Sequence, residues 1–353
     1  MYESFYGLTG KPFQLNPDPS FFFGSRGHKR AFAYLQYGLY QSEGFIVITG
    51  EIGAGKTTIV RSLLEQLDRE KVCAAQLVST QLDADDLLRA VGIAYGLPVR
   101  TVTKAVLLGS LEAFLIQLAM EKKRALLIVD EAQNLTAKAI EELRMLSNFQ
   151  VGDQALLQSF LIGQPELRVM MQRPQMQQLR QRVIASYHLG PLDRAETQAY
   201  IEHRLKHVGW TGDPEFAPEC FDVIHTLTGG IPRRVNTLCN RLLLAGYLAE
   251  RHRLEPADVD AIAGEIRDEL GSDALLSSEP DAPEAEAAAR VPGKRAVSSP
   301  QPGAADVPDL QMHFRKIEDR IDRLEKTVGA AVDLLHALLH PEKDAKTNVA
   351  VKQ

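Results

Sequence analysis

A glycine-rich stretch between residues 50 and 58 carries the strongest chemical signal in the sequence. Its first eight residues read Gly-Glu-Ile-Gly-Ala-Gly-Lys-Thr, which matches the phosphate-binding pattern G-x-x-x-x-G-K-[ST]. Glycines let consecutive backbone N–H groups turn toward phosphate oxygens, and the N-terminus of a following helix favours an anion. We therefore predict a nucleotide-binding loop that consists of Gly50, Glu51, Ile52, Gly53, Ala54, Gly55, Lys56, Thr57 and Thr58.

Two side chains of this loop have further chemistry of their own. Lys56 is expected to reach the β- and γ-phosphates, and the hydroxyl of Thr57 is expected to hold Mg²⁺. The alternative is a chance glycine-rich turn. An apolar strand pattern before the loop and a helical pattern after it favour the phosphate site.

A pair of adjacent carboxylates supplies the second signal. Asp130 and Glu131 follow the apolar run Ala125–Val129. We expect Asp130 to bind the water shell of Mg²⁺ and Glu131 to orient and polarise the attacking water. Two acids can instead simply begin a helix, where the dipole favours carboxylates. The glycine-rich loop upstream favours the catalytic interpretation, and together the motifs predict hydrolysis of a nucleoside triphosphate.

The elements that must position these residues form an alternating pattern over residues 44–192. The short apolar runs predict buried strands at Phe45–Thr49, Val72–Ser79, Ala125–Val129, Leu156–Ile162 and Val183–Leu189. Helical stretches separate them at Thr57–Leu67, Leu82–Tyr95, Leu107–Lys122 and Ala137–Phe149. The alternation predicts an α/β P-loop ATPase domain built on a parallel sheet of about five strands.

Two regions flank this domain. Residues 1–43 are rich in aromatic residues and proline, so we expect an extension that packs on the core and not a disordered tail. Residues 193–270 predict a small all-helical lid, with helices near Ala195–Val208, Pro214–Leu227, Pro232–Glu250 and Pro256–Leu270.

The last part of the chain changes in composition. Residues 271–308 contain six of the 18 prolines and no aromatic residue, which predicts a flexible linker. In residues 309–340 apolar side chains recur at alternating spacings of four and three, which predicts a coiled coil of about four heptads. A tail of residues 341–353 follows. The apolar positions of the coil are Leu310, Phe314, Ile317, Ile321, Leu324, Val328, Ala331, Leu335 and Leu338.

Composition narrows the class of protein. The net charge of the 353 residues is −6, so no global basic field attracts nucleic acid, and we expect no DNA partner. No apolar run approaches the roughly 18–20 residues of a membrane span, and the N-terminus lacks the features of a signal peptide. The three cysteines, Cys73, Cys220 and Cys239, fit a reducing compartment. We therefore expect a cytoplasmic protein.

The combination of the two motifs, the five-stranded core and the helical lid resembles AAA+ ATPases. Several stretches are more specifically similar to the ExeA/GspA-type secretion ATPases, and the overall similarity is greatest to the ATPases of exosortase (PEP-CTERM) and exopolysaccharide gene clusters. The stretches are Tyr6-Gly7-Leu8, Lys11-Pro12-Phe13, Asn16-Pro17-Asp18-Pro19, Asp130-Glu131-Ala132-Gln133-Asn134-Leu135 and Leu161-Ile162-Gly163-Gln164-Pro165-Glu166-Leu167.

The resemblance implies further roles. Gln164 would be the sensor 1 residue beside the water, or else a turn residue before a proline. Arg180 and Arg182 would be candidates for the arginine finger that reaches a neighbouring subunit's ATP, or else surface arginines. Arg233 would be the sensor 2 residue on the lid, or else an exposed arginine at a helix start. His28 and the aromatic N-terminal segment would line the adenine side, although side chains such as Phe21–Phe23 more often belong to a packed core than to a base-stacking site.

Two functions compete at this stage. The first is a Mg²⁺-dependent ATPase that drives or regulates assembly of a secretion or exopolysaccharide system, peripheral at the cytoplasmic face of the inner membrane. It would self-associate into an AAA+ oligomer and bind a coiled-coil or membrane-bound partner. The second is a DNA-acting AAA+ ATPase of the transposition target-selection type. The sequence shows neither a helix-turn-helix motif nor a basic arm, which favours the first.

Overall fold

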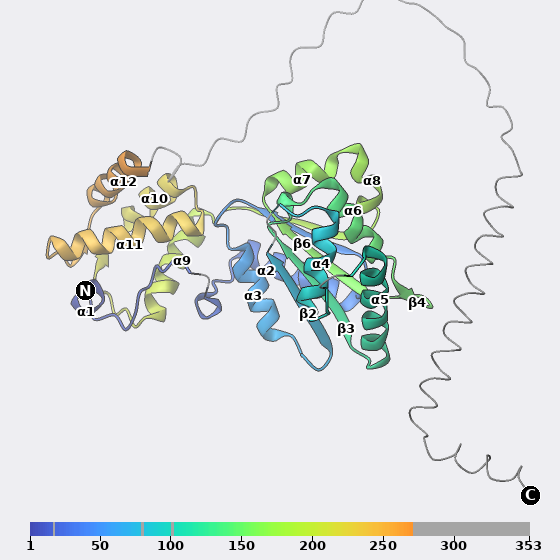
Figure 1. Cartoon of the computed structure of the whole chain (residues 1–353). Coiled ribbons are helices and arrows are strands. Elements are labelled where there is room, and N and C mark those ends of the chain that lie inside the picture. Colours follow the sequence, from blue (N-terminus) through green and yellow to red (C-terminus); the bar gives the residue numbers. More distant parts are fainter. Residues whose placement is uncertain (17, 79–80, 100–101, 271–353) are drawn as a thin grey trace, which may run out of the picture. The chain divides into compact units, whose positions relative to one another are not determined.

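A computed structural model describes residues 1–270, apart from residues 17, 79–80 and 100–101 (Figure 1). The predicted linker, coiled coil and tail, residues 271–353, lie outside the described residues. Within the described part, no helix is long and apolar enough to cross a membrane.

A five-stranded parallel sheet forms the centre of the α/β part, as the sequence predicted. The strand order is β2-β3-β6-β1-β7. The strands are β1 (Phe45–Gly50), β2 (Val72–Val78), β3 (Arg124–Asp130), β6 (Leu157–Gly163) and β7 (Val183–Leu189). Thr49 pairs with Gly163, and Gly50 pairs with Leu189. The carboxyl ends of β1, β6 and β7 therefore meet at one edge of the sheet, where a parallel α/β fold places its ligand site.

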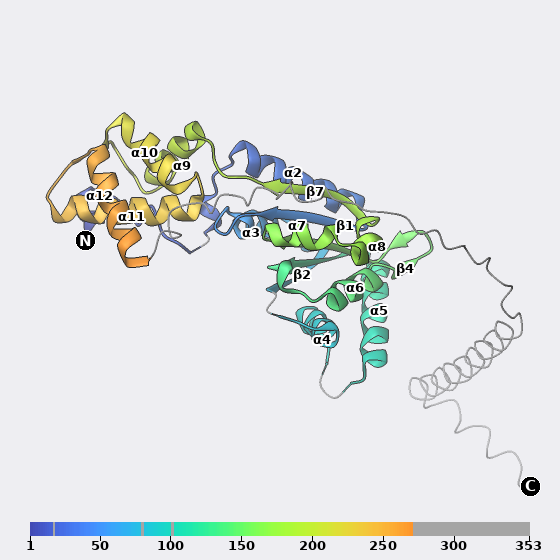
Figure 2. The same ribbon diagram turned by 90° about the horizontal axis from the view of Figure 1, so that it is seen from above.

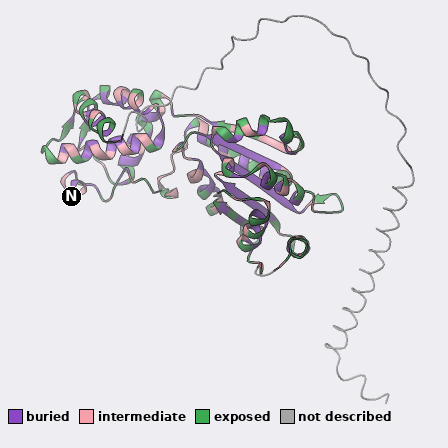
Figure 3. Ribbon diagram, turned by 45° about the horizontal axis from the view of Figure 1, so that its top comes forward, coloured by how far each residue is buried: buried purple, intermediate pink, exposed green. Residues whose placement is uncertain are grey.

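Helices cover both faces of the sheet, and alternate residues of each strand point to opposite faces. On β1, Phe45 and Val47 belong to one hydrophobic core, and Ile46 and Ile48 belong to the other. The first core lies under α4 (Ala84–Ala94), α5 (Lys104–Met120), α6 (Ala137–Leu146), α7 (Pro165–Gln172) and α8 (Gln177–Arg180). The second lies under α2 (Arg26–Gln41) and α3 (Lys56–Gln66). Figure 2 shows α2 and α5 on opposite sides of the sheet, and Figure 3 shows the buried strands between them.

Short elements connect these helices and strands. A 3₁₀ turn, η2 (Ala132–Asn134), follows β3, and η3 (Pro174–Met176) precedes α8. A small antiparallel hairpin of β4 (Gln150–Val151) and β5 (Gln154–Ala155) leads into β6.

The helical part contains α9 (Arg194–His207), α10 (Pro218–Thr228), α11 (Pro232–Leu248) and α12 (Pro256–Leu270). The start of α9 follows from a capping box, in which Asp193 and Glu196 satisfy each other's backbone N–H groups. A two-residue parallel pair, β8 (Glu215–Phe216) with β9 (Arg253–Leu254), is an addition to the predicted helices. The helix predicted from residue 214 begins at Pro218 instead, because β8 occupies the residues before it. Two-residue strands are too short to leave a periodic pattern in the sequence.

The N-terminal segment is divided between two cores, which the sequence pattern did not anticipate. Tyr2, Tyr6, Leu8 and Phe13 are buried in the core of the helical part, and α1 (Tyr2–Phe5) contacts α11. Helix α2, in contrast, packs on the sheet. The stretch between them, which includes the 3₁₀ turn η1 (Pro19–Phe21), links the two cores.

Candidate nucleotide site

The glycine-rich loop connects the end of β1 to the start of α3. Gly53 and Gly55 have φ values of 82° and 97°, in the left-handed region that favours glycine. Space is also restricted at both positions. A Cβ at Gly53 would lie 2.3 Å from Cβ of Arg233, and a Cβ at Gly55 would lie 2.6 Å from Nε2 of His28. The loop shape therefore requires glycine for both conformational and steric reasons.

Lys56 is the first residue of α3 and is buried. Its Nζ donates to the carbonyl oxygens of Gly50 at 2.7 Å and Glu51 at 2.9 Å. Burial lowers the pKa of Lys56, and the nearby carboxylates of Glu131 and Asp130 oppose that shift. The ammonium group thus lies inside the loop, at the positive N-terminal end of a helix, where a phosphate would be stabilised.

Thr57 and Asp130 meet at the end of the sheet. The Thr57 hydroxyl donates to Oδ2 of Asp130 at 3.0 Å. Asp130 is buried, and burial raises its pKa. A hydroxyl and a carboxylate beside a phosphate-binding loop are oxygen ligands of the kind that Mg²⁺ prefers. These residues therefore fit the magnesium site that the sequence predicted.

Glu131 follows Asp130 and lines the same cavity as the glycine-rich loop. Its φ of 54° and ψ of 39° are unusual for a residue with a side chain. Oε2 accepts hydrogen bonds from Nε2 of Gln133 at 2.7 Å and from Nε2 of Gln164 at 3.0 Å. Burial acts to raise the pKa of Glu131, but the two amide donors and Lys56 outweigh it, so the pKa is lowered. The carboxyl group is therefore held as a carboxylate, as a proton acceptor requires.

Gln164 lies at the junction of β6 and α7, directly before Pro165. It is thus a turn residue, and its side chain also reaches Glu131. The structure brings together the two residues that the sequence analysis placed beside a water. Gln133, which contacts both of them, was quoted in the sequence motif but received no role.

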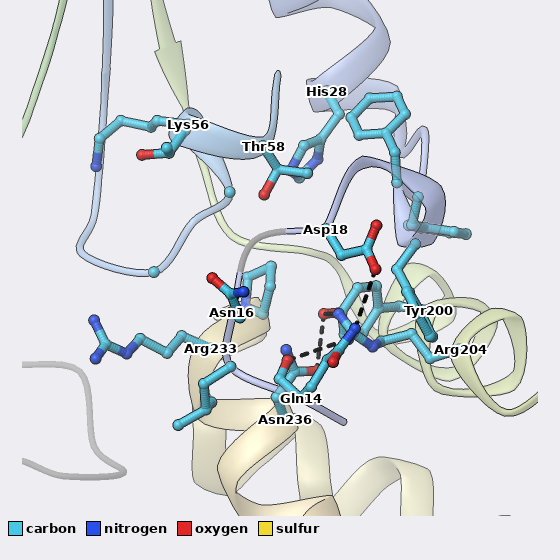
Figure 4. Close-up of a pocket in the computed structure, with 18 of the residues that line it drawn as sticks. Gln14, Asn16, Asp18, His28, Lys56, Thr58, Tyr200, Arg204, Arg233 and Asn236 are labelled. Carbon is cyan, nitrogen blue, oxygen red and sulfur yellow. Dashed lines mark hydrogen bonds between the residues drawn. The ribbon is translucent and has the colours of Figure 1, made fainter. Parts of the chain in front are cut away.

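The cavity beside the loop has a volume of about 360 Å³, at the lower end of the range for small-molecule sites (Figure 4). We call one end of it the phosphate end; its lining residues are Ile52, Gly53, Gly55, Lys56, Thr57, Thr58 and Glu131. We call the other the distal end; its polar lining residues are Gln14, Asn16, Asp18, Tyr200, Arg204 and Asn236. Asn16 and Asp18 stood in a quoted stretch without a role, and sequence reasoning missed the other four, because the six come from three separate segments that no short motif joins.

Arg204 organises the distal end. It is a buried cation, and it donates from Nε to the carbonyl oxygen of Pro12 at 2.5 Å and from Nη2 to that of Gln14 at 3.2 Å. Its Nη1 donates to the hydroxyl of Tyr200 at 3.0 Å, and that hydroxyl donates to Oδ1 of Asn236 at 2.8 Å. The network ties the N-terminal segment to α9 and α11 (Figure 4).

Arg233 lies at the start of α11, against the glycine-rich loop. Its backbone N–H donates to the carbonyl oxygen of Gly53 at 3.2 Å, and the residue lines the cavity. The structure therefore places the backbone of Arg233 against the loop, while the residue is also exposed at a helix start, as the alternative interpretation had it.

His28 also lines the cavity, but both of its ring nitrogens have partners within the chain. Nε2 lies 3.0 Å from the carbonyl oxygen of Ala54, and Nδ1 lies 2.7 Å from Oγ of Ser25. Because a carbonyl oxygen only accepts, Nε2 carries the proton, and Nδ1 accepts from the serine. His28 thus holds the glycine-rich loop in place, and its ring nitrogens are engaged there and not turned to a base.

The aromatic residues Phe21, Phe22 and Phe23 line the cavity and also pack, partly buried, on the two cores, so both interpretations from the sequence apply. The guanidinium of Arg204 lies 4.8 Å from the ring centroid of Phe21, and Phe23 contacts Tyr200 edge-on. Phe22 contacts His28 in the same edge-on manner.

Arg180 and Arg182 lie away from the cavity. They precede Val183, which pairs with Phe45, so they lie at the end of the sheet opposite to Gly50. Nη1 of Arg180 donates to the carbonyl oxygens of Met171 and Arg173. Nη1 of Arg182 donates to Ser147, through both the carbonyl oxygen and Oγ. Neither arginine therefore serves the cavity of its own chain.

Comparison with known proteins supports the P-loop ATPase fold. Residues 39–171 match the family described as AAA domain. General secretion pathway protein A from Aeromonas hydrophila is 39% identical over 273 residues, which are 76% of this chain and 50% of that protein. The chain thus spans about half the length of this relative.

Solved structures share the fold at low sequence identity. Cdc6p from Pyrobaculum aerophilum is 17% identical, with a TM-score of 0.54 over 75% of this chain and 71% of that chain. The Aeropyrum pernix ORC1 protein, solved in complex with DNA, is 16% identical, with a TM-score of 0.53 over 73% and 69% of the two chains. The chain has the AAA P-loop ATPase fold.

Proposed function

We propose that this protein is a Mg²⁺-dependent ATPase that drives or regulates assembly of a secretion system. The observation that carries the proposal is the convergence of Lys56, Thr57 and Glu131 at one end of a single cavity. Asp130 is bonded to Thr57 there, and Gln164 is bonded to the Glu131 carboxylate. A chain that only binds nucleotide has no need of a carboxylate held in this way beside the phosphate-binding loop.

Each residue at the phosphate end has a separate role. The loop N–H groups and Lys56 bind the phosphates, and Arg233 adds positive charge from α11. Thr57 and Asp130 would hold Mg²⁺, which when bound neutralises charge on the phosphate oxygens. Glu131 accepts a proton from the attacking water, and Gln164 holds that carboxylate through Oε2. The distal end would accept the base.

An AAA+ oligomer is part of the proposal. Arg180 and Arg182 are too far from their own cavity to act there, so an arginine finger from this region would serve a neighbouring subunit. Residues 309–340 would recruit a coiled-coil or membrane-bound partner.

The proposal also specifies the secretion system in which the protein acts. Homology to general secretion pathway protein A supports secretion, and we propose that the assembly is exosortase-linked and handles exopolysaccharide. The protein would then act in the cytoplasm, peripheral at the face of the inner membrane.

The test is ATP hydrolysis by the purified full chain, with Mg²⁺ or with excess chelator, and with or without duplex DNA at physiological salt. We expect turnover that requires Mg²⁺ and does not respond to DNA. A Glu131→Gln chain purified in the same way reports contaminating activity. Absence of turnover above that control refutes the ATPase proposal, and strong stimulation by DNA favours the DNA-acting alternative.

A further inference from the structure

Gln133 joins two residues that come from different strands. It lies in η2, two residues after Glu131. Its Nε2 donates to Oε2 of Glu131 at 2.7 Å, and its Oε1 accepts from the backbone N–H of Gln164 at 3.0 Å. One side-chain amide therefore connects the carboxylate after β3 to the first residue after β6.

The residue before Gln164 leaves room for this amide. A Cβ at Gly163 would lie 2.8 Å from Oε1 of Gln133, closer than real Cβ contacts come. It would also lie 2.8 Å from Cδ2 of Leu167, in the first turns of α7. The absence of a side chain at position 163 thus permits the contact between Gln133 and the junction of β6 and α7.

The Glu131 carboxylate is held from one side. Both amide donors, from Gln133 and Gln164, bond to Oε2. Among the residues that the structure describes, no hydrogen-bond donor reaches Oε1. With Oε2 fixed by two amides, the direction of Oε1 is fixed as well, and Oε1 remains for a water.

We propose that Gln133 is a positioning residue for hydrolysis, which orients the Glu131 carboxylate relative to Gln164. This inference rests on the proposed ATPase function and adds a residue to it. The alternative is that Gln133 only stabilises the turn after β3. That alternative explains neither the second contact, to Gln164, nor the close approach at Gly163.

The experiment replaces Gln133 in the full chain and separates binding from turnover. Gln133→Leu removes both hydrogen bonds and keeps a side chain of similar volume. We expect kcat to fall by about 10- to 100-fold, because small displacements of a group that acts on the reacting atoms cost rates of this order. We expect the Kd for a fluorescent ATP analogue to change by less than about twofold, since Gln133 does not line the cavity.

A second variant distinguishes the two contacts and protects the test against misfolding. Gln133→Glu keeps an acceptor for the N–H of Gln164, but as a carboxylate it cannot donate to Glu131 and places a like charge beside it. We expect a loss of kcat at least as large as that of Gln133→Leu, with the Kd for the ATP analogue retained as evidence of a folded chain. Gln133→Asn, which keeps the amide, should recover part of the lost kcat.

The matched control is Gln117→Leu. Nε2 of Gln117 donates to Oε1 of Glu121 at 3.1 Å on the exposed side of α5. The control therefore removes the same kind of amide–carboxylate hydrogen bond at a place remote from the cavity. We expect unchanged kcat and KM for this control.

A double-mutant cycle with Gln164→Leu provides the last readout. If both amides act by holding one carboxylate oxygen, the double variant should lose less than the product of the single losses. Wild-type kcat in Gln133→Leu and Gln133→Glu, in a chain that Glu131→Gln inactivates, would overturn the inference and leave the ATPase function intact. An inactive unmodified chain would instead refute the proposed function, and the inference with it.

Discussion

Apart from Glu131, the phosphate end of the cavity is built from residues that are almost consecutive in the chain, whereas the distal end is built from segments nearly 200 residues apart. Residues 50–58 follow one strand and begin one helix, so backbone geometry alone places their N–H groups. At the distal end, Arg204 bonds to the backbone of Pro12 and Gln14, which precede it by 192 and 190 positions in the sequence.

The difference separates two ways of making a binding site. The phosphate end rests on a rigid sheet edge and on main-chain groups that every residue has. The distal end depends on a buried guanidinium that satisfies carbonyl oxygens of another segment, so its shape depends on how the helical part packs. Substitutions at the first end should therefore act on phosphate chemistry, and those at the second on fit to the base and on stability.

The largest effect should come from Glu131→Gln at the phosphate end. An amide cannot accept the proton of the water, so we expect turnover to fall by about 10²- to 10⁴-fold with little change in ATP affinity. Steady-state hydrolysis and equilibrium binding measured on the same preparation check this. Retained turnover would mean that another group accepts the proton.

Lys56→Ala should have the next largest effect. The buried ammonium group is the cation of the loop, and a charge-assisted hydrogen bond to phosphate is worth about 1.5–3 kcal/mol. We expect the Kd for ATP to rise by about 10- to 100-fold, and the Kd for inorganic triphosphate to rise by the same factor. Calorimetric titration with both ligands makes the measurement. An unchanged affinity for ATP would refute the phosphate end as defined.

Arg204→Met tests the distal end, where a substitution should affect the binding of ATP but not that of inorganic triphosphate. The carbonyl oxygens of Pro12 and Gln14 lose their donor in a buried site, at a cost of about 1–3 kcal/mol for each unsatisfied group. We expect a lower thermal midpoint and weaker binding of ATP, by about fivefold to tenfold, with binding of inorganic triphosphate unchanged.

The control for Arg204→Met is Arg253→Met, which removes an exposed arginine from the same helical part. Surface ion pairs contribute about 0–1 kcal/mol, so we expect this control to match the unmodified chain. If Arg204→Met weakened the binding of triphosphate and of ATP equally, the phosphate end and the distal end would not act independently in binding.

The smallest expected effect is on the pH dependence of stability, through His28, which holds the glycine-rich loop. Burial lowers the pKa of His28, although the nearby Glu196 carboxylate opposes that shift. In the unfolded chain the imidazole takes up a proton below about pH 6.5, whereas the folded chain resists it. The unfolded state then binds more protons, so stability must fall as the pH falls below that value.

His28→Gln removes this titration and keeps a donor for the carbonyl oxygen of Ala54. We expect the thermal midpoint of the unmodified chain to drop more between about pH 7.5 and 5.5 than that of the variant. Equal drops would show that His28 is not a source of the pH dependence.

Much of the α/β part could be predicted because its signals are local. The apolar runs that became β1, β3 and β6 are continuous, since these strands are buried on both faces. The glycine-rich loop and Asp130-Glu131 are contiguous motifs. The resemblance to AAA+ ATPases placed Gln164 beside the water, and the structure adds a direct hydrogen bond from Gln164 to Glu131.

Other features depended on contacts that no window of sequence contains. The aromatic residues of the N-terminal segment indicated burial, but not that Tyr2 and Phe13 enter the core of the helical part. His28 was expected on the adenine side and does line the cavity, but only the structure shows that its ring nitrogens bond to Ala54 and Ser25. Gln133 stood in a quoted motif, and only its distances to Glu131 and Gln164 gave it a role.

The sequence by itself determined the phosphate chemistry and the parallel sheet that presents it, because hydrophobic periodicity, glycine conformation and strand ends are properties of neighbouring residues. The tertiary structure alone decided which distant side chains complete the cavity. Arg204, Tyr200 and Asn236 come together with the N-terminal segment because buried polar groups must find hydrogen-bond partners, and those partners lie wherever the packing of the two cores places them.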